Sequence, residues 1–147
     1  MGWLEDLEGQ IVGIDTAPII YFIEAQSVYL PIVKPFFQGL GDDRFTAVTS
    51  AITLLEVLVH PLRQNRTDLV QKYRQILRHA KGLTIYNLTP DIAEQAAALR
   101  AKYNLRTPDA IQVVAASLHG GATIFLTNDR GLQRVAEINV LVLDNLI

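Results

Sequence analysis

The sequence predicts a three-layer α/β/α fold built on a central, mostly parallel sheet of about five strands. Five short runs are rich in β-branched, aromatic or other apolar residues, which is typical of strands. They span residues 11–14, 44–50, 83–86, 122–127 and 140–143. Longer segments with helix-start signals lie between them, and strands that alternate with helices favour a parallel sheet with right-handed crossovers.

The composition is that of one globular domain spanning residues 1–147, since hydrophobic residues make up 50% of the chain. No stretch of membrane-spanning length is free of charges or helix breakers, and the N-terminus carries Glu5, Asp6 and Glu8. We therefore expect a cytoplasmic protein with no membrane contact. Because the chain has no cysteine, disulfides, thiolate nucleophiles and cysteine zinc sites are excluded.

The first strand ends on Asp15, which is followed by Thr16 and by Pro18 in the first turn of a helix. In open α/β sheets, ligands bind outside the carboxyl ends of the strands. Asp15 therefore either belongs to a site or caps the helix that follows, and its own position leaves both readings open.

The segment 29–40 is apolar and contains Pro31 and Pro35. Pro35 is predicted to break or kink any helix there. The apolar side chains belong either to the core or to a groove that receives a partner protein or a second copy of the chain.

A helix is expected over residues 51–60, capped by Ser50 and stopped by Pro61. It is apolar almost all round, which predicts burial, and Glu56 shares a stripe with Ile52 and Val59. A buried carboxylate must meet a cation, accept hydrogen bonds or be protonated. Glu56 is therefore a candidate ligand, with a salt bridge to an arginine as the alternative.

An amphipathic helix begins at Thr67 or Asp68 and carries most of a basic cluster. Against the single acid Asp68, the cluster comprises Arg63, Arg66, Lys72, Arg74, Arg78 and Lys81. Such a run is either a phosphate-facing surface or an ordinary solvated helix face.

Two helix starts have the same residues. Thr89-Pro90-Asp91 opens a helix that runs to about Tyr103, and Thr107-Pro108-Asp109 opens another, with threonine as the predicted N-cap of both. Both acids complement a helix dipole. The second helix is apolar on most faces, which places Asp109 at the mouth of a core helix.

The strand at 122–127 is followed directly by Asn128 and Asp129, and a short helix to about Ile138 precedes the last strand. If this strand neighbours the first one, the carboxylates of Asp15 and Asp129 meet. Clustered carboxylates repel each other unless a cation joins them, and Arg130 is the one cation nearby in sequence. Oxygen ligands without cysteine or histidine suit Mg²⁺ or Mn²⁺.

Four motifs in this order resemble those of PIN-domain ribonucleases, and in particular the small VapC-like toxins. They are Gly13-Ile14-Asp15-Thr16, Ile52-Thr53-Leu54-Leu55-Glu56, Thr107-Pro108-Asp109-Ala110-Ile111 and Leu126-Thr127-Asn128-Asp129. The resemblance covers residues 11–144 and implies a Mg²⁺- or Mn²⁺-dependent endoribonuclease acting on single-stranded RNA. It implies that Asp15, Glu56, Asp109 and Asp129 are the metal ligands and catalytic residues, supported by Thr127 and Thr16. Ala17 departs from the small polar residue that the family often has there.

Other classes fit less well. A haloacid-dehalogenase-like phosphatase needs a second aspartate where Ala17 stands, and a receiver domain needs an aspartate near Asn87 and a lysine near the last strand. Neither a Gly-x-Gly-x-x-Gly motif nor a P-loop occurs. The remaining alternative is a catalytically inactive PIN-like module that binds RNA or protein.

The expected partners follow from the resemblance. They are single-stranded RNA, a small antitoxin protein if the chain is a toxin, and a second copy of the chain in a homodimer.

Overall fold

The structure is a computed structural model and describes residues 2–147. Its five strands are all parallel and lie in the order β3-β2-β1-β4-β5. They are β1 (Ile11–Ile14), β2 (Thr46–Ser50), β3 (Leu83–Tyr86), β4 (Ile124–Thr127) and β5 (Asn139–Val142). The predicted fold class is therefore confirmed, and β1 and β4 are direct neighbours.

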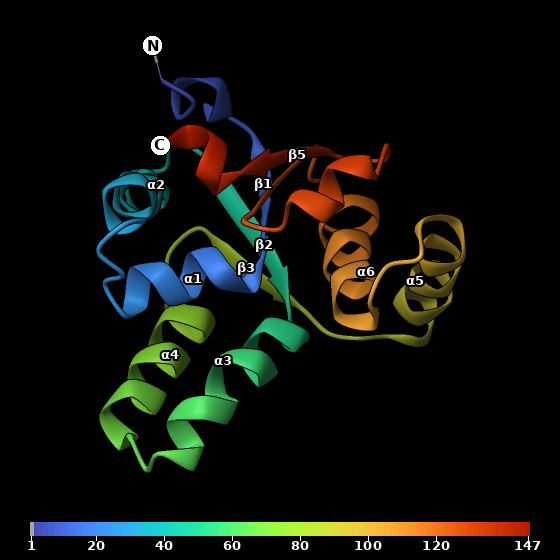
Figure 1. The fold of residues 1–147 in the computed structure, drawn as a ribbon. Helices are drawn as coiled ribbons and strands as arrows, with labels where there is room; N and C mark the ends of the chain where they lie inside the picture. Colours follow the sequence, from blue (N-terminus) through green and yellow to red (C-terminus); the bar gives the residue numbers. More distant parts are fainter. Residues whose placement is uncertain (1) are drawn as a thin grey trace.

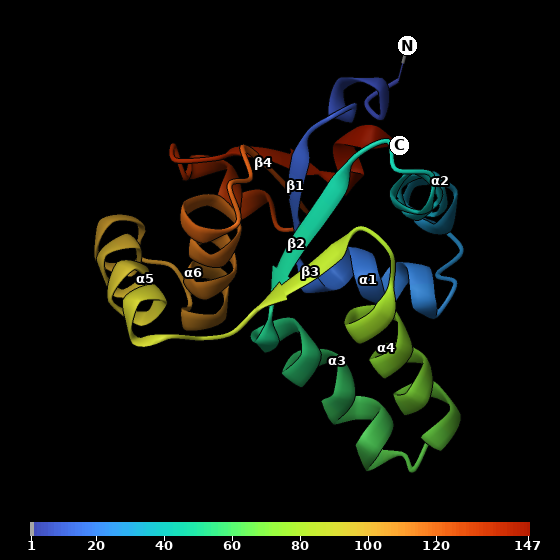
Figure 2. The ribbon, with the colours of Figure 1, turned by 180° about the vertical axis from the view of Figure 1, so that it is seen from behind.

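Helices cover both faces of the sheet. They are α1 (Thr16–Ile23), α2 (Leu30–Gly41), α3 (Ala51–Arg63), α4 (Thr67–His79), α5 (Pro90–Tyr103) and α6 (Thr107–Val114). Figures 1 and 2 show α5 and α6 on one face, α1 and α2 on the other, and α3 and α4 as a hairpin that extends beyond the strand ends. No helix among residues 2–147 combines the length and the hydropathy needed to cross a bilayer.

Short segments complete the chain. Three 3₁₀ turns span Glu5–Leu7, Arg130–Arg134 and Leu143–Leu146, and one π-helical turn, Ala115–His119, continues α6. The short helix that the sequence predicts before β5 is the 3₁₀ turn Arg130–Arg134, and it ends four residues earlier than Ile138.

Alternation along the strands divides the apolar side chains between two cores. Val12 and Ile14 of β1 pack into the core under α1, α2 and α4, whereas Phe125 of β4 packs under α5 and α6. Gly13 faces α6, and a Cβ atom there would lie 2.6 Å from that of Ala116. The absence of a side chain at Gly13 lets the end of α6 approach the sheet.

Pro35 does not break its helix, and Pro61 does not stop the helix that it was predicted to stop. Helix α2 continues through Pro35, and α3 continues through Pro61 to Arg63. Each proline removes one backbone hydrogen bond, and the burial of neighbouring side chains offsets that loss. Val33 and Phe36 of α2 are fully buried, so this segment contributes to the core.

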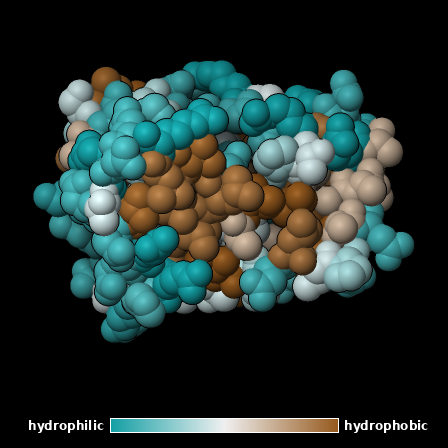
Figure 3. All heavy atoms as spheres, turned by 90° about the horizontal axis from the view of Figure 1, so that it is seen from below, coloured by the Kyte–Doolittle hydropathy of each residue, from teal (hydrophilic) through white to brown (hydrophobic). Residues whose placement is uncertain are grey.

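The prediction that α3 is buried on most faces is wrong. Its buried residues are Thr53, Val57 and Pro61, while Leu55 is 61% exposed and Leu62 is 54% exposed. The helix extends past the sheet, where α4 covers one side of it (Figure 1). Figure 3 views this end of the molecule and shows a broad hydrophobic surface.

Candidate active site

Asp15 and Asp129 follow neighbouring strands at the carboxyl edge of the sheet. The backbone N–H of Asp15 donates to the carbonyl of Leu126 in β4 at 2.9 Å, so β1 and β4 stay paired up to this edge. Parallel pairing in register brings the residues that follow both strands to one edge. This is the position that open α/β folds use for ligands.

The carboxylate of Asp15 is partly buried and accepts two hydrogen bonds. Oδ1 accepts from the backbone N–H of Thr16 at 2.8 Å, and Oδ2 accepts from the hydroxyl of Thr127 at 2.7 Å. Asp15 is thus the N-cap of α1 and also faces the strand edge. Burial raises the pKa of Asp15. The nearby carboxylates of Asp109 and Glu56 raise this pKa further by repulsion, and the two hydrogen bonds lower it.

Thr127 connects Asp15 to Asp129. Its side chain is fully buried, and its oxygen accepts a hydrogen bond from the backbone N–H of Asp129 at 3.1 Å while donating to Asp15. The exposed carboxylate of Asp129 accepts from the N–H of Gly131 at 2.9 Å and so caps the turn Arg130–Arg134. Asp129 therefore has a cap role of its own, as Asp15 does.

Glu56 is exposed, which corrects the expectation that its carboxylate is buried. The stripe of α3 that faces the protein is Thr53, Val57 and Pro61, one residue away from the stripe predicted from the sequence. Oε1 of Glu56 accepts from the hydroxyl of Thr16 at 2.7 Å. Within the described chain no lysine or arginine forms an ion pair with Glu56, so the salt-bridge alternative finds no support there.

Asp109 is buried and is held by Arg106. The guanidinium donates from Nε to Oδ2 at 2.9 Å and from Nη2 to Oδ1 at 3.2 Å, in a forked geometry. Arg106 and not Arg130 is therefore the cation beside the acids, because Arg130 donates to the side chain of Asn145. Asp109 raises the pKa of Arg106 most strongly, and more distant Asp129 and Glu56 also raise it.

The start of α6 explains the Arg106 pairing and corrects the predicted cap. The N-cap is Arg106 and Thr107 is already helical, so the helix begins one residue earlier than predicted. Asp109 then lies three residues after the N-cap, within reach of the arginine side chain.

The carboxylate oxygens of the four acids are ligands of the kind that hard cations prefer. Burial is the main cause of the raised pKa of Asp15, and the nearby charges of Asp109 and Glu56 add to it, so a bound cation would relieve repulsion there. As the side chains stand, no three acidic or histidine side chains among residues 2–147 lie close enough to hold one ion together. Asp15 is linked through threonines to Glu56 and Asp129, while Asp109 is engaged by Arg106.

Sequence reasoning missed Gln112. This residue is 1% exposed and contacts polar side chains from α1, β2 and α3. The signal was present, since Gln112 is the only strongly polar residue in the apolar run 110–116. A buried amide without partners is costly, so its presence there indicates a polar network.

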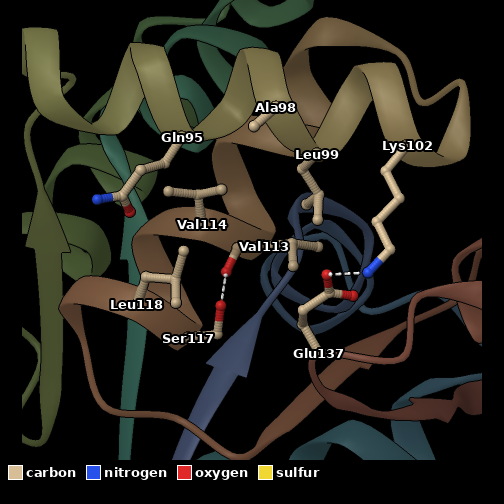
Figure 4. A pocket seen from close by; sticks show the side chains of 9 residues that line it. All are labelled: Gln95, Ala98, Leu99, Lys102, Val113, Val114, Ser117, Leu118 and Glu137. Atoms are coloured by element: carbon tan, nitrogen blue, oxygen red, sulfur yellow. Dashed lines mark hydrogen bonds and ion pairs between the residues drawn. The ribbon is translucent and has the colours of Figure 1, made fainter.

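A mainly apolar groove lies away from these acids. It occupies about 210 Å³ between α5 and α6 and is mainly apolar, with Leu99, Val113 and Val114 in its lining. Figure 4 shows this groove and the ion pair between Lys102 and Glu137 at one end, with an N–O distance of 3.1 Å. None of the four candidate acids lines it.

Solved structures with a similar fold include toxin–antitoxin proteins. VapBC2 from Rickettsia felis, bound to a DNA fragment from its promoter, aligns with a TM-score of 0.71 at 16% identity, over 90% of this chain and 98% of that one. A toxin–antitoxin complex from Klebsiella pneumoniae aligns with a TM-score of 0.66 at 24% identity, over 92% and 98%. VapC20 from Mycobacterium tuberculosis, a sarcin–ricin loop cleaving toxin, aligns with a TM-score of 0.64 at 17% identity, over 79% and 87%.

These identities show a common fold, and no curated protein matches the sequence. The sequence itself matches the PIN domain family over residues 12–138. That match begins at the second residue of β1, continues past β4 and includes all four candidate acids. The chain therefore belongs to the PIN domain family.

Proposed function

We propose that the protein is a metal-dependent endoribonuclease that hydrolyses phosphodiester bonds of single-stranded RNA. The observation that carries this proposal is the linked set of acids at the carboxyl edge of β1 and β4. Thr127 links Asp15 to Asp129, and Thr16 links Asp15 to Glu56. Asp109 lies close enough to raise the pKa of Asp15.

Asp15, Glu56, Asp109 and Asp129 would hold Mg²⁺ or Mn²⁺. When bound, such an ion supplies an activated water and stabilises the negative charge that develops on the phosphoryl group. The donor oxygens are presented by a strand end, two helices and a 3₁₀ turn, and Thr127 and Thr16 orient two of the carboxylates. No histidine base is needed for this chemistry.

The RNA strand would be attracted by cations around the acids. Arg106 is the nearest one, and its side chain is 74% exposed although it pairs with Asp109. Between α3 and α4, Arg66 pairs with Asp68 at 3.1 Å, and after the end of α4 Lys81 pairs with Asp43 at 2.9 Å. The other cations of the basic cluster, Arg63, Lys72, Arg74 and Arg78, are exposed to solvent. Phosphate contacts of this kind weaken as salt concentration rises.

We also propose that the protein is a toxin that binds a protein partner. The proposal is supported by the similar structures, which include VapBC2 and a toxin–antitoxin complex. The exposed apolar stripe of α3, Leu55, Val59 and Leu62, is the surface that a small antitoxin or a second copy of the chain would cover. Size-exclusion chromatography with light scattering on the wild type and on Val59→Glu distinguishes the homodimer from a monomer. A dimer that Val59→Glu leaves intact would place the interface elsewhere. A short antitoxin gene beside this one would favour the toxin role.

The enzyme proposal is tested by incubating purified protein with end-labelled single-stranded RNA in Mn²⁺, in Mg²⁺ and in EDTA. We expect cleavage with either ion, none in EDTA, and a higher melting temperature with Mn²⁺ because the ion binds the folded state. Undiminished cleavage in EDTA would overturn the metal dependence. RNA binding without any product in Mn²⁺ would favour the inactive binding module instead.

A further inference from the structure

Gln112 occupies a buried position where three elements meet below the acids. It lies on α6, three residues after Asp109, and is 1% exposed. Its amide contacts Ser50 at the end of β2, Thr53 on α3 and Thr16 on α1. A buried amide of this kind is stable only if its oxygen and both hydrogens are paired.

The orientation of the amide follows from the cap of α3. The side-chain oxygen of Ser50 accepts from the backbone N–H of Ile52 at 3.3 Å, as an N-cap does. The hydroxyl hydrogen of Ser50 is then available to donate, and Oε1 of Gln112 lies 2.6 Å away. The amide oxygen therefore faces β2, and the amide nitrogen faces α1 and α3.

The two amide hydrogens go to two threonines. Nε2 of Gln112 donates to Oγ1 of Thr16 at 3.2 Å and to Oγ1 of Thr53 in a short contact. Thr53 also accepts from the hydroxyl of Thr49 at 3.0 Å, and its oxygen lies 3.1 Å from that of Thr16. The hydroxyl oxygens of Thr16 and Thr53 thus accept hydrogen bonds from buried side chains. Each hydroxyl keeps its own hydrogen to donate.

Only one direction remains for the hydrogen of Thr16. Its hydroxyl donates to Oε1 of Glu56 at 2.7 Å, while its backbone N–H donates to Asp15. The hydrogen bonds from Ser50 to Gln112, from Gln112 to Thr16 and from Thr16 to Glu56 therefore run from the interior toward a carboxylate that can only accept when it is ionised. Thr16 bridges two of the candidate ligands, and Gln112 sets which way that bridge points.

We propose that Gln112 is a positioning residue which, by donating to Thr16 and Thr53, commits the Thr16 hydroxyl hydrogen to Glu56 and so holds this exposed carboxylate beside Asp15. The effect on catalysis rests on the proposed function, whereas the hydrogen-bond assignment does not. Leucine or methionine at position 112 would fill the space but leave Ser50, Thr53 and Thr16 without this partner. Glutamate would present two acceptors where the threonines need a donor.

The first test needs no activity. In the metal-free protein labelled with ¹⁵N, the two side-chain amide protons of Gln112 are expected to be protected from exchange. Thr16→Val should shift one of these protons and Thr53→Val the other, and Thr16→Ser should restore the first. The side-chain amide of Gln95 is the internal control, because it lies on α5 in the groove of Figure 4, which Thr16 and Thr53 do not line.

The second test compares Gln112→Met with Gln95→Met in RNA cleavage with Mn²⁺. Loss of a residue that orients a metal ligand typically costs about 10- to 100-fold in activity or metal affinity. We expect Gln112→Met to lower kcat by that factor and to weaken Mn²⁺ binding in calorimetry, with KM for RNA near that of the wild type. Gln95→Met should stay within about twofold on both measurements, because Gln95 lies in the groove between α5 and α6 and none of the four candidate acids lines that groove.

A double-mutant cycle shows whether Gln112 acts through Thr16. Gln112→Met combined with Thr16→Val should lower kcat no further than Thr16→Val alone, because both changes remove the same bridge. If Gln112→Met does not fold, the pair Thr16→Val and Thr16→Ser carries the test, with loss expected in the first and retention in the second.

Three results would overturn the proposal. The first is additive effects on kcat in the double-mutant cycle, and the second is a Gln112→Met protein that loses thermal stability but keeps kcat and Mn²⁺ affinity. The third is that Thr16→Val leaves the resonances of the Gln112 side-chain amide protons unchanged. A wild-type protein that does not cleave RNA under any of these conditions would contradict the proposed function instead. In that case the amide spectra and the Mn²⁺ titration still decide whether Gln112 positions Glu56.

Discussion

Helices α5 and α6 begin with the same tripeptide, Thr-Pro-Asp, yet the two starts differ by one residue in register. In α5 the first helical hydrogen bond runs from the N–H of Ala93 to the carbonyl of Thr89, which is the N-cap. In α6 the equivalent bond runs from Ala110 to Arg106, so Thr107 is already inside the helix. One residue corresponds to a turn of about 100° around the helix axis.

That shift, together with burial, separates the two acids. The side chain of Asp91 is 70% exposed and lies 3.8 Å from His119, whereas the side chain of Asp109 is 10% exposed and forms two hydrogen bonds with Arg106. Every residue of α6 from Asp109 to Val114 is buried, while α5 exposes one face. The comparison teaches that a helix-start acid becomes a candidate ligand because of where its helix packs, since its own motif is shared by both.

The largest expected difference concerns RNA cleavage by Asp109→Asn and Asp91→Asn. If Asp109 holds the metal, Asp109→Asn should reduce cleavage in Mn²⁺ by about two orders of magnitude or more, because a ligand charge is lost. Asp91→Asn should leave the rate close to that of the wild type. Equal rates for the two variants, measured on proteins of equal melting temperature, would mean that the start of α6 is not part of an active site.

A smaller effect is expected when the basic residue beside each of these two aspartates is replaced. Arg106→Gln frees Asp109, so Mn²⁺ should bind more tightly in calorimetry while the metal-free protein loses about 1 kcal/mol, because charge-assisted hydrogen bonds to an exposed arginine are weakened by solvent. His119→Gln is the matched change at Asp91 and should alter neither quantity. Unchanged Mn²⁺ affinity in Arg106→Gln would show that the guanidinium does not compete with the ion.

The caps themselves should differ in stability. Thr89 accepts a hydrogen bond from the N–H of Ile92 at 3.2 Å, so Thr89→Ala should cost about 1 kcal/mol in urea unfolding. Thr107 is exposed and makes no cap bond, so Thr107→Ala should stay within about 0.5 kcal/mol. Similar losses of stability in both variants would indicate that Thr107 is the N-cap of α6, as the sequence predicts.

The smallest expected effect is a change in pH dependence. Burial raises the pKa of Asp15, so the folded protein binds this proton more tightly than the unfolded chain does. The corresponding stability is present below the ordinary carboxyl pKa and is lost as pH rises through the raised value. Thermal melts in EDTA should therefore show a smaller loss toward neutral pH in Asp15→Asn than in the wild type, and Asp91→Asn should follow the wild type.

Much of the fold could be predicted because its determinants are local. Ser50 and Thr89 cap the helices that the sequence assigns to them, and Asn104 ends α5 with a left-handed φ of 55°. The strand that carries Asp15 and the strand before Asp129 are neighbours, as the site prediction required. The prolines were misjudged because the cost of a lost hydrogen bond depends on how much apolar surface the rest of the helix buries.

The candidate site likewise has features that the local sequence sets and features that depend on how distant segments pack. The sequence by itself determined the strand ends, the acids that follow or flank them and the family, because hydrophobic period and short-range capping are written within a few residues of each position. Only the tertiary structure decided that Glu56 is exposed and that Gln112 joins α1, β2 and α3. Those facts depend on rotations about helix axes and on which distant segment covers each face, and no local pattern specifies either of them.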